Sequence, residues 1–309
     1  MTPSGKTVEP LDSKSLAIVL LTAALWGGTP VAVSFAASSL PPVAIAAVRF
    51  ALGALFMLAW CWLGRTPMRL QPGQFRLCLV AGLLLAVQIV TFNVAIEWSN
   101  ASHSSVLIST FVFWVIAIEH FITKTDRLTT RKAMGLVVAF IGVLVMLSKA
   151  EKVSASVPVQ DDPSLAGDLV MVFSAFLLAV RVVYVKQVLP RIEPGKLILW
   201  HDLVGVVCFL SFSFAFEEFT RQALTVAAVL GLLYQGLLVA GLCFALQTQL
   251  LKKHSASQLS MFSFSTPVFG VLLAAVFRDD PLSSWLFISG ACIALGIYIV
   301  NSQPQQKTA

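Results

Sequence analysis

Residues 101–129 read ASHSSVLISTFVFWVIAIEHFITKTDRLT, and residues 256–283 read ASQLSMFSFSTPVFGVLLAAVFRDDPLS. The two stretches align at an offset of 155 residues, which falls to 154 after the charged turn at their ends. The apolar segments that follow them align as well. This internal similarity predicts that the chain is built from two copies of one unit, each about half its length.

The composition is typical of an integral membrane protein. Hydrophobic residues make up 58% of the chain and charged residues 12%, and the mean hydropathy is +0.87, far from soluble averages. A membrane-spanning helix needs about 20 apolar residues. We expect ten such helices, near residues 15–36, 43–64, 77–97, 102–122, 132–149, 165–188, 197–216, 224–247, 255–277 and 284–302.

The basic residues give an expected orientation, because cytoplasmic loops carry the excess of Lys and Arg. With the N-terminus inside, fifteen of the 21 Lys and Arg residues fall on cytoplasmic segments and four on the opposite side. The remaining two, Arg49 and Arg181, lie within predicted helices. We therefore expect a multi-pass protein of a bacterial-type inner (plasma) membrane with both termini cytoplasmic.

A unit of five helices crosses the membrane an odd number of times, so its second copy must enter from the other side. The predicted fold is an all-α integral membrane protein with ten transmembrane helices in two inverted five-helix repeats. Its expected parts are a cytoplasmic tail (1–14), the first repeat (15–149), an extracytoplasmic linker (150–164), the second repeat (165–302) and a cytoplasmic tail (303–309).

One string makes a family resemblance specific: LWGGTPVAVSFAASSLPPVAIAAVRFALGAL, from Leu25 to Leu55. It resembles the first two helices of EamA-type permeases of the drug/metabolite transporter (DMT) superfamily. The turns at 126–129 (DRLT) and 280–283 (DPLS), each leading to a last helix with small residues, are similar to those permeases too. The resemblance spans about residues 15 to 302 and implies a transporter, in a family whose members carry amino acids, nucleotide-related metabolites or drugs.

The chain departs from the family pattern at three places. Val112 stands where a proline is usual in the fourth helix, although its counterpart Pro267 is present in the ninth. Arg181 lies in the sixth helix, where relatives are commonly uncharged. Trp26 and Gly27 occupy the level at which related small multidrug resistance proteins carry a glutamate. Proton-for-cation exchange at that level is therefore not supported, and proton coupling elsewhere stays open.

Several polar and aromatic residues are predicted to lie within about two turns of mid-membrane, from the helical rise of 1.5 Å per residue. Polar groups there avoid lipid and turn inward. They either line a solute site or pack between helices, as Ser and Thr often do. The candidate substrate-binding residues are Trp26, Thr29, Gln88, Thr91, Tyr234, Gln235, Ser263 and Thr266.

The charged residues within the predicted helices distinguish better between a functional site and simple helix packing. Arg181 and Asp202 are expected at nearly the same depth, with His201 beside them, and we hypothesise an Arg181–Asp202 pair that gates the cytoplasmic side or forms a static bridge. Arg49 has Glu97, Asp168 or a solute carboxylate as candidate partners. Glu119, His120, His103 and His254 lie near helix ends, where solvation is the expected state.

Small residues suggest both flexible points and close packing. The candidate hinge residues are Gly27, Gly28, Pro30 and Pro267. In single-repeat relatives the last helix forms the dimer contact. Here the pairs Gly135/Gly142 and Ser289/Gly296, each seven residues apart, predict that the last helices of the two halves pack on each other, so a monomer would suffice.

The favoured hypothesis is a secondary transporter, most simply an exporter of small amphipathic metabolites such as amino acids, working by alternating access. A lipid or lipid-linked-sugar flippase of the same fold is the alternative. An intramembrane enzyme lacks support, because the sequence has no HExxH, GxSxG or paired GxGD motif. The five cysteines lack CxxC spacing, so we expect no metal and no cofactor. The positive charge reports membrane topology rather than a nucleic-acid partner.

Overall fold

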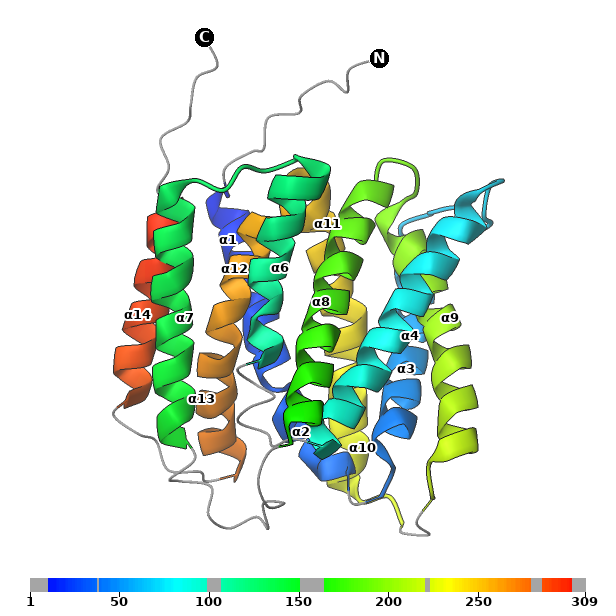
Figure 1. The fold of residues 1–309 in the computed structure, drawn as a ribbon. Helices are drawn as coiled ribbons and strands as arrows, with labels where there is room; N and C mark the ends of the chain where they lie inside the picture. The colour runs from blue at the N-terminus through cyan, green and yellow to red at the C-terminus, as the bar shows by residue number, and fades with distance from the viewer. Residues whose placement is uncertain are drawn as a thin grey trace.

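The computed structural model describes residues 11–37, 39–98, 107–150, 164–219, 223–278 and 285–301. All regular secondary structure within these ranges is helical, and the helices stand side by side in one bundle (Figure 1). Helix α1 begins and helix α14 ends at the same end of the bundle, drawn at the top of Figure 1. We refer to this end as the α1 end.

The helices of the first half follow the predicted order. They are α1 (Ser13–Gly27), α2 (Thr29–Ala36), α3 (Pro42–Leu63), α4 (Gln74–Trp98), α6 (Phe111–Ala117), the π-helix η1 (Ile118–Thr123) and α7 (Thr130–Ala150). The second half has α8 (Leu165–Val188), α9 (Pro194–Phe216), α10 (Val226–Leu233), the π-helix η2 (Tyr234–Cys243), α11 (Phe244–Lys253), α12 (Ala256–Met261), the 3-10 helix η3 (Phe262–Ser265), α13 (Thr266–Arg278) and α14 (Trp285–Asn301).

Seven helical runs within the described ranges are long and apolar enough to cross a membrane. They are Ser13–Ala36, Pro42–Leu63, Gln74–Ile96, Leu165–Val188, Pro194–Phe216, Val226–Lys253 and Ala256–Phe277, and two shorter apolar helices cover Leu107–Thr123 and Phe287–Val300. Large apolar side chains point outward from them, among them Leu55, Trp62, Phe214 and Val226. A surface of this kind is stable in lipid rather than in water. The chain is therefore an all-α membrane protein.

One predicted boundary is wrong. The span expected near 224–247 continues to Lys253, because hydropathy falls at Gln247 while the helix does not end there. The amide of His254 still donates to the carbonyl of Leu250, and Lys252 and Lys253 are exposed at the α1 end. Hydropathy marks the part of a helix that lies in lipid, whereas backbone hydrogen bonds determine where the helix ends.

The π-helix η2 packs against α3, and its glycines lie opposite side chains of α3 that are one helical turn apart. A Cβ atom on Gly236 would lie 2.3 Å from Cβ of Leu52, and one on Gly241 would lie 2.5 Å from Cγ of Phe56. Five residues of η2 thus span four residues of α3. The wider turn of a π-helix, with its i→i+5 hydrogen bonds, advances less per residue and keeps the two glycines on one face. Small residues there let the backbones approach closely.

The last helices of the two halves pack on each other as predicted. The carbonyl oxygen of Gly296 lies 2.6 Å from the position a Cβ would take on Gly135, and that of Ser289 lies 2.9 Å from the corresponding position on Gly142. Such contacts require residues without side chains, or nearly so, at each crossing point. The predicted packing of α7 on α14 is confirmed.

This interface gives a first testable expectation. Gly296→Ala should lower the free energy of unfolding by about 1–3 kcal/mol, a typical cost of overpacking, because the new Cβ would lie 2.5 Å from the Gly135 carbonyl oxygen and 2.6 Å from the Ala139 nitrogen. Gly290→Ala in the same helix is the matched control, since its Cβ would meet only Cγ1 of Val268, at 3.8 Å. Unfolding in detergent micelles measures both. Equal effects from the two variants would contradict the glycine contact.

Candidate functional site

A chain of three buried polar side chains joins α8 to α9. Nη1 of Arg181 lies 3.4 Å from Nε2 of His201, and Nδ1 of His201 lies 2.8 Å from Oδ1 of Asp202. The exposed fractions are 8%, 1% and 0%. Arginine only donates hydrogen bonds, so Nε2 accepts and the proton of a neutral imidazole is assigned to Nδ1, which donates to Asp202. His201 is thus held as one tautomer between the two charges.

The hypothesised Arg181–Asp202 pair therefore takes a different form. Among the described residues, the ion pairs within 4.0 Å do not join Arg181 to Asp202, and His201 bridges them instead. The Asp202 charge still acts on Arg181 electrostatically. Arg181 lies seven residues before the end of α8, about 10 Å along the helix at 1.5 Å per residue. The charges are thus well below the α1 end.

Phe244 is the aromatic centre of this cluster. The Arg181 guanidinium carbon lies 5.3 Å from its ring centroid, within cation–π range. The Phe244 ring also lies 6.1 Å from Trp26, 6.0 Å from Phe50 and 6.1 Å from His201. Phe244 opens α11 directly after the π-helix η2, which sets the direction in which the ring points. Sequence reasoning missed this residue, because one phenylalanine in an apolar helix carries no distinguishing signal.

Arg49 lies on the inner face of α3. Leu52, Gly53 and Phe56, one or two turns further along that face, meet η2 and α9. The Arg49 guanidinium carbon is 5.2 Å from the Phe50 ring centroid. The charge of Asp202 acts on Arg49, whereas the described ion pairs do not join Arg49 to Asp168. The side chain of Glu97, the other predicted partner, lies outside the described residues.

Several buried polar atoms, including three of the charged residues, have no hydrogen-bond partner among the described residues. Among them are Nε of Arg49, Nε of Arg181, Oδ2 of Asp202, Oγ1 of Thr29, Nε2 of Gln235 and Oε1 of Gln247. A buried polar atom without a partner costs roughly 1–3 kcal/mol. Those of Arg49, Arg181 and Asp202 belong to side chains whose charges act on one another, which is unusual for a purely structural core.

Five of the eight predicted lining residues fall into two groups. Gln88 and Thr91 are used within the fold: the Gln88 side-chain amide donates to the Ser174 hydroxyl at 3.4 Å, and the Thr91 hydroxyl donates to the carbonyl of Val87 at 2.8 Å. Tyr234 donates to the carbonyl of Leu25 at 2.7 Å. Trp26 and Ser263, by contrast, line a narrow internal hollow too tight for a water molecule, together with Thr22, Gln247, Phe262 and their neighbours.

The predicted hinge residues meet where α1, α2 and α13 touch. Gly28 separates α1 from α2, and Pro30 lies in the first turn of α2, where its missing N–H interrupts the hydrogen-bond ladder. A Cβ on Gly27 would lie 2.7 Å from the carbonyl oxygen of Thr266, beside Pro267 in the first turn of α13. Gly27, at the end of α1, thus packs directly on the first turn of α13, which contains Pro267.

A coupling experiment tests this junction. Gly28→Ala should be destabilising, because its Cβ would lie 2.4 Å from the Tyr234 hydroxyl oxygen and 3.0 Å from Cζ. Tyr234→Phe alone should cost about 1 kcal/mol through the lost hydrogen bond to Leu25. In the Tyr234→Phe background the alanine should cost about 1 kcal/mol less, measured as a double-mutant cycle of unfolding free energies. Strictly additive effects would contradict the contact.

A second set of contacts lies at the α1 end. The carboxylate of Glu119, 0% exposed, accepts hydrogen bonds from the amides of Ala256 at 3.1 Å and Ser257 at 2.7 Å. The ammonium of Lys186 donates to the carbonyl of Leu251 at 2.7 Å, and Nε2 of His254 lies 3.1 Å from the Ser15 hydroxyl. We call these contacts the α1-end latch. The expected solvation of Glu119 and His254 is wrong, because the facing half covers both side chains.

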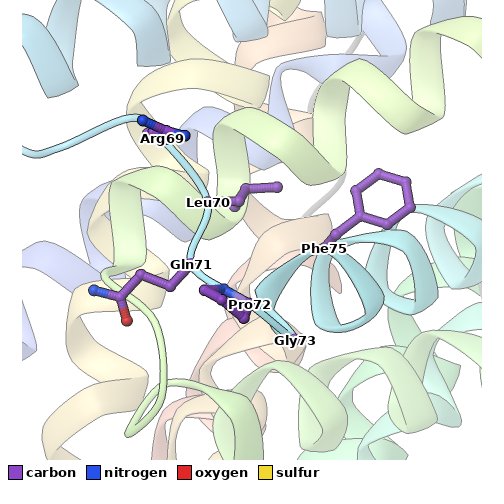
Figure 2. A pocket seen from close by; sticks show the side chains of 6 residues that line it. All are labelled: Arg69, Leu70, Gln71, Pro72, Gly73 and Phe75. Atoms are coloured by element: carbon purple, nitrogen blue, oxygen red, sulfur yellow. The ribbon is translucent and has the colours of Figure 1, made fainter.

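A larger hollow of about 670 Å³ lies elsewhere, on the segment between α3 and α4. Figure 2 shows its six lining residues, Arg69, Leu70, Gln71, Pro72, Gly73 and Phe75. Their side chains diverge rather than converge on one point (Figure 2), and Phe75 is exposed. This hollow contains none of the predicted site residues and lacks the convergent polar groups of a ligand site.

The sequence model of the EamA-like transporter family matches residues 13–148 and, separately, residues 165–302. The chain belongs to the EamA-like transporter family. The resemblance inferred from residues 25–55 and the two charged turns is thereby confirmed. As a member of this family the chain is a multi-pass membrane transporter of small-molecule solutes and not an enzyme.

Individual EamA relatives are similar over most of their length. The uncharacterized transporter YoaV of Bacillus subtilis is 26% identical over 278 residues, which cover 89% of this chain and 92% of the relative. The "Probable amino-acid metabolite efflux pump" of Salmonella typhimurium is 25% identical over 292 residues, 91% of this chain and 93% of its own. A solved crystal structure with 19% identity superposes with a TM-score of 0.77, covering 93% of this chain and 98% of that one. This last likeness concerns the fold.

Proposed function

We propose that the protein is a secondary exporter of small amphipathic metabolites such as amino acids, with its solute site at the Arg49, Arg181, His201 and Asp202 cluster. The observation that carries the proposal is a set of buried charges inside apolar membrane-spanning helices, with polar atoms left unpaired beside Trp26 and Phe244. Intramembrane charges mark solute or ion pathways. The name of the Salmonella relative supports efflux of amino-acid metabolites.

The proposal includes ten crossings in two inverted halves, 15–149 and 165–302. Support comes from helix contacts that recur when the halves are exchanged: α1 packs on α13 as α8 packs on α6, and α3 packs on η2 as α9 packs on α4. The contacts of α7 with α14 and of α3 with α9 each join equivalent helices of the two halves, so exchanging the halves leaves these contacts unchanged. Helix α1 runs away from the α1 end and α8 runs toward it (Figure 1), as inversion requires.

We place the α1 end in the cytoplasm, with both termini there and the protein in an inner membrane, since most basic residues fall on that side. The α1-end latch then closes the cytoplasmic side. In alternating access, the latch and the Arg181–His201–Asp202 chain separate when the inner side opens, while Gly27, Gly28, Pro30 and Pro267 bend. Trp26, Thr29, Gln235, Ser263 and Thr266 line the path, and a single chain supplies both halves.

Flux measurements in proteoliposomes test the proposal. The protein should move at least one solute from a panel of amino acids, amines, nucleosides and drugs, measured with and without a pH gradient. A dependence on the gradient would assign proton coupling, for which His201 and Asp202 are the proposed groups. Solute flux should be absent from protein-free vesicles. Lipid scrambling without any solute flux would instead establish the flippase alternative and overturn the proposal.

A further inference from the structure

The charged cluster carries more positive than negative charge. Among the residues that the structure describes, Arg49 and Arg181 face one carboxylate, Asp202, and His201 is hydrogen-bonded as a neutral side chain. The charge of Asp202 acts on both arginines. Outside water, an uncompensated ion is strongly unfavourable unless an opposite charge approaches it. The described part of the cluster therefore has one more positive than negative charge, which an anion would balance.

The two arginines are not equivalent. Arg181 is 8% exposed, is bonded to His201 and lies against the Phe244 ring. Arg49 is only half-buried, its Nε atom is buried without a described partner, and its described contact is with its neighbour Phe50. The described ion pairs do not include it. Arg49 is thus the arginine that can receive an anion from the solute.

The negative charge lies next to this position on the same face of α3. Oδ2 of Asp202, which has no partner among the described residues, lies 3.3 Å from the point where Gly53 would carry a Cβ. Gly53 follows Arg49 by one helical turn, about 6 Å along the axis. Oδ2 of Asp202 and Nε of Arg49, neither of which has a hydrogen-bond partner among the described residues, therefore lie beside the same short stretch of helix.

The chemistry of an arginine fork defines what it binds. A guanidinium presents paired N–H donors that match the two oxygens of a carboxylate, whereas a cation or a neutral amide offers no such match. A cationic solute without a carboxylate would add to the excess positive charge of the cluster. The geometry thus favours carboxylates and disfavours simple cations.

We propose that Arg49 is the residue that selects solutes bearing a free carboxylate, with Oδ2 of Asp202 placed to receive an ammonium group when the solute has one. This inference rests on the proposed transport function and adds the specificity determinant. The transporter should therefore reject a solute when its carboxylate is removed, even if its apolar part and its ammonium group are unchanged.

Matched solutes provide the test. Proteoliposomes containing the full chain are assayed with L-phenylalanine, L-leucine and L-threonine, with the C-terminal amide of each, and with the panel of amines, nucleosides and drugs. We expect every transported solute to carry a free carboxylate, and each amide to move at least about 10-fold more slowly than its acid. Transport of amines, nucleosides or amides at rates equal to or above the acids would overturn the inference and leave the transport function standing.

Variants assign the effect to Arg49. Arg49→Gln should raise KM for the transported acid by roughly 10–100-fold and remove the preference over its amide. Arg49→Lys, which keeps the charge but not the fork, should fall between Arg49→Gln and the unchanged protein. Arg76→Gln, at an exposed arginine of α4, should leave KM unchanged. A preference that persists in Arg49→Gln would overturn the assignment. If no solute moves at all, the proposed function itself fails.

Discussion

Asp202→Ala should lower the free energy of unfolding by about 3–5 kcal/mol, the usual cost of removing one partner from a buried charge cluster, and should abolish transport. The carboxylate is fully buried and its charge acts on both arginines. Without it, Arg49 and Arg181 would face each other's charge inside the bundle, and His201 would lose its acceptor. Equilibrium unfolding in detergent micelles measures the stability effect, and flux in proteoliposomes measures the transport effect.

Two further variants separate charge from geometry. Asp202→Asn can still accept a hydrogen bond from His201 but lacks the charge, so transport should be lost with a smaller loss of stability. Glu193→Gln is the control, because Glu193 and Lys252 form an exposed pair at 3.8 Å, and exposed pairs contribute about 0–1 kcal/mol. An Asp202→Asn protein that folds and transports at the full rate would refute a gating role for this carboxylate.

Glu119→Ala should be the second most damaging substitution, with a loss of roughly 2–4 kcal/mol in unfolding free energy. Its carboxylate accepts from two amides at the start of α12, and burial prevents water from replacing it. Because the contact joins the two halves across the α1-end latch, we also expect proteolysis at that end to become faster. Glu119→Gln, which keeps an acceptor oxygen, should lose about half as much stability.

The chain offers a graded control for this effect. Glu217 caps α3 through the amides of Val43 at 2.8 Å and Ala44 at 3.0 Å, but it is only half-buried. Glu217→Ala should therefore cost about 1 kcal/mol. The exposed Glu218 should tolerate alanine within about 0.5 kcal/mol. Equal losses for Glu119 and Glu217 would show that burial does not set the strength of these caps.

Hydropathy predicted the helical membrane fold because it acts locally. A run of apolar residues must be buried in lipid wherever it occurs, so most helices begin and end close to their expected positions. The close packing of Gly135 on Gly296 was predictable for a related reason. Small residues seven apart lie on one face of a helix, and such faces are the common contact in membranes.

The detailed site could be predicted only in part. The helical rise gives the depth of a residue, so Arg181, His201 and Asp202 were expected together. It does not give the direction of each side chain. The placement of His201 between Arg181 and Asp202, and the position of Phe244 beside them, could therefore not be predicted. The direction of Phe244 depends on the π-helix before it, and helix-period arguments assume α-helical turns. The burial of Glu119 depends on α12, which lies far along the chain.

The π-helix η2 makes the length of this segment as important as its composition. Five residues of η2 span four residues of α3, so loss of one residue between Gly236 and Gly241 would let the segment close as an ordinary α-helix, with Phe244 still directed toward Trp26 and Arg181. An added residue would instead rotate everything after it by about 100°, turn Phe244 away, and displace the Lys252 end of the helix from its position near Glu193. A single insertion here should therefore be tolerated far less than a single deletion.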